Sequence, residues 1–150
     1  MRQARTARRI AGMAVLVVLV AYQSADAQTI GHVKNVSGDV VVMRGQDTTK
    51  AVAGYALEES DIVKTGADGS VGILFVDDTM MSAGPNSEVV LARFRPEAKA
   101  DPAFQTDVRK GTLSVISGRI AKKSPTAMTV TTPRSILGVR GTYFLVKVEE

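Results

Sequence analysis

Short hydrophobic runs separated by turn-forming residues fill the chain from residue 28 onward. Asp39–Arg44 contains three adjacent valines, which indicates a strand that is buried on both faces. Both faces of Ser70–Val76 are also apolar, with Val71, Ile73 and Phe75 on one face and Gly72, Leu74 and Val76 on the other. A strand of this kind belongs inside a sandwich, inside a solenoid or at an interface.

Later runs alternate between apolar and polar residues. Side chains that should point inward are Leu113, Val115, Met128 and Val130, and those that should point outward are Thr112, Ser114, Thr129 and Thr131. The last run is Thr142–Val148, where Thr142, Phe144, Val146 and Val148 share one face and Lys147 points away. These runs predict strands with one dry face and one wet face.

Composition and turn signals agree with an all-β fold. From residue 28 to the end there are 17 Val, 6 Ile and 12 Thr but only 6 Leu, and β-branched residues favour strands. Glycine-containing turn signals recur between the runs. We therefore expect one all-β domain over residues 28–150, with many short strands in a solenoid-like or a sandwich-like arrangement. Only Arg95–Gln105, with two prolines, is expected to be an exposed connection that can include a helical turn.

The first 27 residues have the three parts of a secretory signal peptide. Four arginines precede the apolar run from Ile10 to Ala21, and small residues ending in Ala25-Asp26-Ala27 follow it. A retained anchor is the alternative, but 12 helical residues reach only about 18 Å, against roughly 30 Å of hydrocarbon core. We expect cleavage between Ala27 and Gln28, a periplasmic or secreted product, and no stable membrane anchor afterwards.

Charge and cysteine content exclude several functions. The chain has 19 Lys and Arg, 15 Asp and Glu and no Cys. Without the first 27 residues, 15 basic and 14 acidic groups remain, so there is no basic surplus for binding nucleic acid. The absence of Cys rules out a disulfide scaffold, a thiol nucleophile and a Cys-ligated metal site.

Candidate catalytic and metal-binding residues are few. His32 is the only histidine and is expected to be an exposed or structural residue of the first strand. Asp77 and Asp78 could hold calcium or act as an acid and base pair, but adjacent strand residues point to opposite faces. In a turn they would instead accept backbone N–H bonds, and Asp61 is likewise expected in a turn. We predict no enzymatic activity and no cofactor.

Five basic residues gather near two aromatic ones: Arg93, Arg95, Lys99, Arg109 and Lys110 surround Phe94 and Phe104. Aromatic and basic side chains together can stack nucleic-acid bases. Because acidic residues are interspersed among them, we expect a solvated face or a protein-contact surface.

Several motifs, taken in order, resemble the FecR domain, the periplasmic domain of iron-dicitrate-type sigma-factor regulators. The matching segments are Ser60-Asp61-Ile62-Val63, Thr65-Gly66, Ser70–Phe75, Asp77-Asp78-Thr79, Gly84-Pro85-Asn86-Ser87, Lys110–Leu113, Thr132-Pro133 and Val139-Arg140-Gly141-Thr142 with the strand that follows. The likeness covers about residues 33–148. Ser60 and Asp78 stand where glycine is usual in the family, and Asp tolerates a positive φ well.

The resemblance implies an exported module that acts by protein contact in the bacterial envelope, with a possible link to cell-surface signalling. Its partner would be an envelope protein or a second copy of the chain, bound through sheet edges or through Val71–Val76. A structural or glycan-binding envelope protein is the alternative. Arg140 is either buried against Asp61, Asp77 or Asp78, which is the role we favour, or exposed for recognition. The glycines at 138 and 141 are expected to permit a tight bend.

Overall fold

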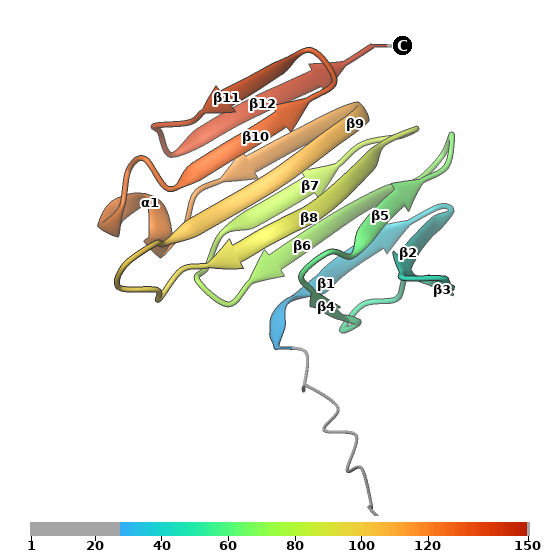
Figure 1. Ribbon diagram of the computed structural model, residues 1–150. Helices are drawn as coiled ribbons and strands as arrows, with labels where there is room; N and C mark the ends of the chain where they lie inside the picture. Colours follow the sequence, from blue (N-terminus) through green and yellow to red (C-terminus); the bar gives the residue numbers. More distant parts are fainter. Residues whose placement is uncertain (1–27, 150) are drawn as a thin grey trace, which may run out of the picture.

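The computed structural model describes residues 28–149, which form one curled β-sheet around a single core (Figure 1). The strands are β1 (Thr29–Ser37), β2 (Val40–Arg44), β3 (Asp47–Lys50), β4 (Ala56–Glu58), β5 (Ile62–Thr65), β6 (Ser70–Phe75), β7 (Met80–Ala83), β8 (Glu88–Arg95), β9 (Ala103–Ile116), β10 (Met128–Thr132), β11 (Ser135–Gly138) and β12 (Tyr143–Val148). One short helix, α1 (Arg119–Lys123), follows β9. The fold is all-β, as the sequence predicts.

The sheet curls into two walls that share the long strand β9. Wall A contains β1, β4, β6, β7, β12 and the second half of β9, and wall B contains β2, β3, β5, β8, β10, β11 and its first half. The change of partners occurs near Gly111, which has a φ of +88°. A Cβ there would lie 2.2 Å from the Ser87 hydroxyl oxygen, so only glycine fits at this junction.

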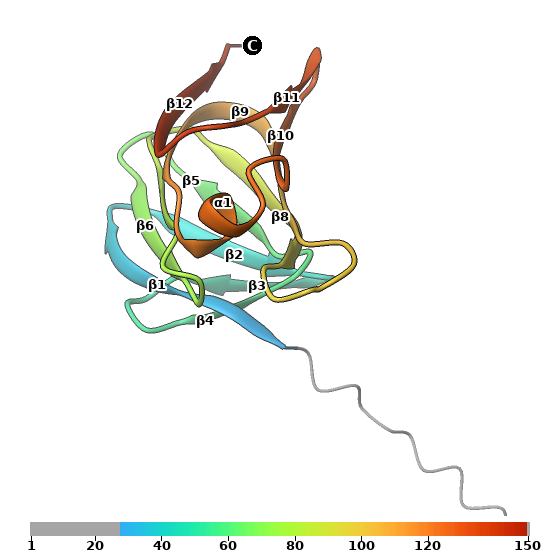
Figure 2. The ribbon, with the colours of Figure 1, turned by 90° about the vertical axis from the view of Figure 1, so that its left-hand side faces the viewer.

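The apolar faces of the two walls meet in the core. Phe75 of wall A lies 5.0 Å from Phe94 and 5.1 Å from Phe104 of wall B, measured between ring centroids. Helix α1 closes one end of the curl, where it occupies the centre in the end-on view (Figure 2). Its Ile120 side chain is fully buried among the core residues.

The structure confirms most of the predicted strands. Val71, Ile73 and Phe75 are buried while Leu74 and Val76 are exposed, so β6 does have two apolar faces. The inward and outward assignments in β9, β10 and β12 are also correct. Instead of stacked solenoid coils, the strands form one antiparallel sheet that folds onto itself, with β9 and β10 as a parallel pair.

The predicted connection at Arg95–Gln105 is present but shorter than expected, and it contains no helix. Phe94 pairs with Phe104 and Arg95 with Ala103, so that only residues 96–102 lie outside the ladder of β8 and β9. The helix instead covers Arg119–Lys123.

The predicted signal peptide and its cleavage site before Gln28 lie outside the described residues, apart from Gln28 itself. Within residues 28–149, no helix has the length and hydrophobicity needed to cross a bilayer.

Candidate functional site

The residues of the sequence motifs fall into separate clusters rather than one site. His32 is exposed on β1, and the described part of the chain contains no grouping of three or more His, Asp or Glu side chains suited to a metal ion. The hydrogen bonds of each cluster join separate segments of the chain.

The first cluster joins the β6–β7 turn to helix α1. The fully buried Asp77 carboxylate accepts hydrogen bonds from the backbone N–H and the hydroxyl of Thr79, at 3.1 and 2.9 Å, and from the Ile120 N–H at 3.2 Å. Gly118 packs on this turn so closely that a Cβ would lie 2.2 Å from the Asp77 carbonyl oxygen. Asp77 is thus a turn and helix-capping residue, as expected of it in a turn. Asp78 points to solvent and pairs with Arg119 at 3.4 Å.

The second cluster joins β5, the β7–β8 turn and the middle of β9. The Thr65 hydroxyl donates to the Gly84 carbonyl at 2.6 Å and accepts from the Ser87 N–H at 2.8 Å. The Ser87 hydroxyl in turn accepts from the Thr112 N–H at 3.0 Å. The Asn86 N–H donates to the Gly66 carbonyl at 3.0 Å, and Pro85 lies in the same exposed turn. This cluster therefore holds three chain segments together.

The third cluster joins Arg44 of β2 in wall B to Glu58 of β4 in wall A and to Asp61 in the turn after β4. Arg44 donates two hydrogen bonds of 2.8 Å to the fully buried Asp61 and one of 2.7 Å to Glu58. The hydrogen bond with Asp61 raises the pKa of the Arg44 guanidinium further above its usual range, although partial burial opposes the shift. Asp61 also accepts the Glu58 N–H at 2.9 Å, so it serves the turn as well as the ion pair.

The favoured role for Arg140 is wrong. Its side chain is exposed, and none of the three candidate carboxylates pairs with it. Those carboxylates already bind Arg44, the Ile120 N–H and Arg119, which leaves Arg140 in solvent. The nearby main chain is anchored instead by Ser117, which donates to the Gly141 and Thr142 carbonyls at 2.7 and 2.8 Å.

The two glycines beside Arg140 are not required by the bend. Neither Gly138 nor Gly141 has a positive φ, and a Cβ on either would meet nothing within 4 Å. Val139 is held by its N–H bond to the Met128 carbonyl at 3.0 Å. The structure gives no steric reason for glycine at these two positions.

The predicted basic and aromatic cluster does not form a stacking platform. Phe94 and Phe104 are buried in the core and pack on Phe75. Arg93 and Arg109 pair with Asp101 and Glu88, each at 2.7 Å. These aromatic rings are therefore inaccessible to bases.

An exposed row of hydrophobic side chains crosses the outer face of wall A. Cross-strand pairing places His32 opposite Leu74, Leu74 opposite Met80, Met80 opposite Ile116, and Ile116 opposite Tyr143. The last four of these residues, which we call the apolar row, are 38%, 37%, 41% and 61% exposed. The row thus spans β6, β7, β9 and β12 without interruption.

The neighbouring row on the same face is uncharged. It runs through Asn35, Gly72, Ser82, Ser114 and Leu145. Neither row contains Asp, Glu, Lys or Arg. A face that is depleted of charge and carries Met and Tyr has the composition of the centre of a protein interface.

Sequence reasoning found only part of this face. Leu74 and Val76 were identified by the two-sided pattern of their strand. Tyr143 and Leu145 alternate with Phe144 and Val146 in the same way, so the signal for them was present but unused. Met80 and Ile116 are single apolar residues at strand ends, and only the sheet register reveals that they are neighbours.

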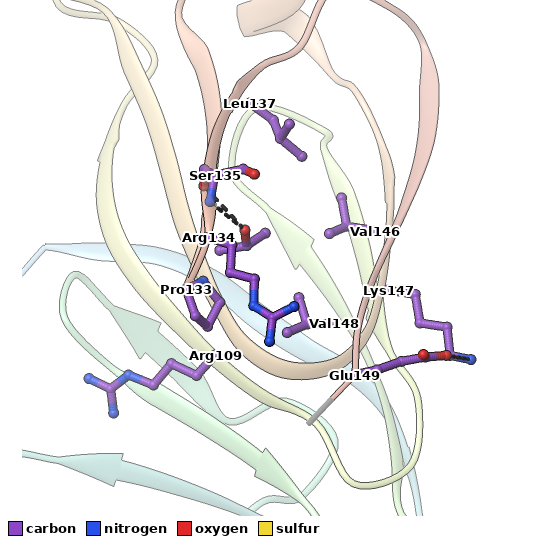
Figure 3. Close-up of a pocket in the computed structure, with 10 residues that line it drawn as sticks. Arg109, Pro133, Arg134, Ser135, Leu137, Val146, Lys147, Val148 and Glu149 are labelled. Atoms are coloured by element: carbon purple, nitrogen blue, oxygen red, sulfur yellow. Dashed lines mark hydrogen bonds and ion pairs between the residues drawn. The ribbon is translucent and has the colours of Figure 1, made fainter.

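A groove opens between β12 and the β10–β11 hairpin. It has a volume of about 680 Å³. Most of its lining residues come from β11, β12 and the turn between β10 and β11 (Figure 3). The strands β11 and β12, the outermost strands of the two walls beside the groove, diverge from each other in the end-on view (Figure 2). Leu137, Val146 and Val148 give it an apolar floor, and Arg134, Lys147 and Glu149 lie around it. The core is therefore covered incompletely where β11 and β12 diverge.

Comparison with known families places the chain in the family of FecR proteins. The FecR protein family model matches residues 61–150, which include the first two clusters, Asp61 of the third cluster and the whole apolar row. The chain belongs to this family. No curated protein and no solved structure is significantly similar to the chain.

Proposed function

We propose that this chain is an exported FecR-domain protein that acts without enzymatic chemistry, as a protein-interaction module in the bacterial envelope. The apolar row on wall A carries the proposal. Exposed hydrophobic side chains scattered singly are ordinary, but a contiguous, charge-free set across four strands is typical of a contact surface. The clusters of family-motif residues support it indirectly, because their hydrogen bonds are used to hold the sheet together.

The location in the envelope rests on the N-terminal segment and on the family. A signal peptide over residues 1–27 would deliver residues 28–150 to the periplasm or beyond. FecR domains belong to envelope signalling regulators, so a link to cell-surface signalling is part of the proposal. The partner would then be another envelope protein that presents a complementary apolar face.

A capture experiment with matched variants tests the proposal. The exported chain is used to capture proteins from envelope extract, in parallel with the double variant Leu74→Lys/Ile116→Lys and with Thr48→Lys/Thr49→Lys on the exposed strand β3. We expect one defined protein to bind the unmodified chain and the β3 variant but not the apolar-row variant. Equal capture by all three would contradict the proposal, and sedimentation with purified peptidoglycan would favour a glycan-binding role.

A further inference from the structure

The backbone of β12 has a free edge. Among the described strands β12 pairs only with β9. The Ser117 N–H donates to the Thr142 carbonyl at 2.8 Å, which makes Thr142 a hydrogen-bonded partner of β9. Since hydrogen-bonding direction alternates along an antiparallel strand, the N–H and C=O groups of Tyr143, Leu145 and Lys147 point away from β9. Three residues therefore offer six backbone groups to an additional strand.

This edge has few of the features that normally prevent strand addition. Its register with β9 is continuous from Tyr143 opposite Ile116 to Val148 opposite Gly111, with no bulge. It contains no proline, and its only charged residue, Lys147, points outward. The other edge strands are shorter, because β3 and β11 have four residues each and β4 has only three. In addition, β3 is entirely exposed and has the polar sequence Asp-Thr-Thr-Lys. Natural sheets protect their edges by charge, shortness or bulges, and of these β12 has only the single charge of Lys147.

We infer that β12 pairs with β12 of a second copy of the chain, antiparallel and around a two-fold axis at Leu145. This inference deepens the proposed function by naming one partner. It concerns the edge of wall A rather than its outer face.

Side-chain pairing selects this axis. It places Leu145 opposite the partner's Leu145 and Phe144 opposite the partner's Val146, so apolar side chains meet on both faces of the joined sheet. Tyr143 lies opposite the partner's Lys147, whose aliphatic stem and ammonium group suit an aromatic ring. An axis at Lys147 would instead place two lysines opposite each other, which is unfavourable.

The second copy would also cover exposed apolar surface. Tyr143 and Leu145 are 61% and 57% exposed in the isolated chain. The added strand would continue wall A past β12, and its inward side chains would enter the groove beside Leu137 and Val146. Pairing therefore satisfies the free backbone groups and extends the incompletely covered core.

A single cysteine tests the axis directly, because the chain contains no cysteine. Hydrogen-bonded pairs in antiparallel sheets have Cα atoms about 5.5 Å apart, a separation that a disulfide spans. We expect Leu145→Cys in the full exported chain to form a covalent dimer on mild oxidation, and the control Asp47→Cys on β3 to remain monomeric. Equal cross-linking of the two variants would overturn the inference.

Sedimentation equilibrium supplies the independent measurement. The unmodified chain should show a concentration-dependent monomer–dimer equilibrium, and Leu145→Lys should weaken it about tenfold or more because two lysines would meet on the axis. Leu145→Pro should act similarly while leaving the circular dichroism and thermal unfolding intact, since its missing N–H points away from β9. A monomer at every concentration would overturn the inference. If Leu145→Lys still captures an envelope protein, the proposed function stands and only the self-pairing is affected.

Discussion

The carboxylate of Asp77 accepts a hydrogen bond of 3.2 Å from the backbone N–H of Ile120, 43 residues further along the chain. The bond fixes the β6–β7 turn to the helix that closes the end of the curl. Ile120 in turn places its buried side chain in the core. A turn motif near the middle of the sequence thus positions the only helix of the described residues.

Replacing Asp77 should destabilise the fold substantially. Asp77→Ala removes three hydrogen bonds and leaves the buried N–H groups of Thr79 and Ile120 without an acceptor. We expect a loss of about 2–4 kcal/mol in the free energy of unfolding, measured by urea denaturation. Asp78→Asn at the exposed neighbouring position should change it by less than about 0.5 kcal/mol. Similar effects for the two variants would contradict the capping role of Asp77.

Glycine at position 60 should stabilise the chain. Ser60 has a φ of +71°, a left-handed conformation that is unfavourable for serine. Relief of this strain exceeds the added flexibility of glycine in the unfolded chain, so we expect Ser60→Gly to gain about 0.5–1 kcal/mol in thermal or urea unfolding. Ser60→Ala keeps the strain and should gain nothing. Asp78→Gly, at a φ of +67°, should gain less because Asp tolerates this conformation.

Arg44 should matter more than other basic residues because its partner is buried. Arg44→Met leaves the fully buried Asp61 charge without its guanidinium, and we expect a loss of about 3 kcal/mol in the free energy of unfolding. The control is Lys123→Met, since Lys123 and Glu97 are both exposed and their ion pair contributes little. A double-mutant cycle with Asp61→Asn should show strong coupling. Additive effects would argue against the pair.

Glu88 should give the fold an acid-dependent component of stability. Burial alone would raise the pKa of Glu88, but hydrogen bonds from Arg109 and Lys64 outweigh it and lower the pKa below the usual 4.5. Because the pKa of Glu88 is lower in the folded state than in the unfolded chain, its ionised carboxylate stabilises the fold. This contribution to the free energy of unfolding is complete above the unfolded-state pKa and is lost as the pH falls through the folded-state pKa. Glu88→Gln should therefore lower the urea midpoint of unfolding at pH 7. In strong acid the urea midpoints of the variant and the unmodified chain should differ less. A constant difference across this range would contradict the prediction.

Arg140 should be dispensable for folding. Its side chain is exposed and pairs with none of the three candidate carboxylates, so Arg140→Ala should change the free energy of unfolding by less than about 0.5 kcal/mol. A loss of several kcal/mol would revive the buried role that the sequence favoured.

The sequence predicted the strands well because hydrophobic alternation directly records which face is buried. It also placed Asp77 in a turn and marked Ser60 and Asp78 as positions where glycine is usual, and both have a positive φ. It missed α1, since five residues with one buried side chain carry no helical period, and the helix is held by Asp77 from another element. The sequence did not predict the apolar row, because Met80 and Ile116 become neighbours only through the pairing of β7 with β9.

Site-specific photo-crosslinking in the producing cell tests the central claim most directly. A photoreactive residue is placed at Ile116, in the middle of the apolar row, or at Thr49 on the opposite wall. The account predicts a discrete cross-linked protein from position 116 and none from position 49. Absence of a product at 116, or the same products at both positions, would contradict the claim that this chain works through the outer face of wall A.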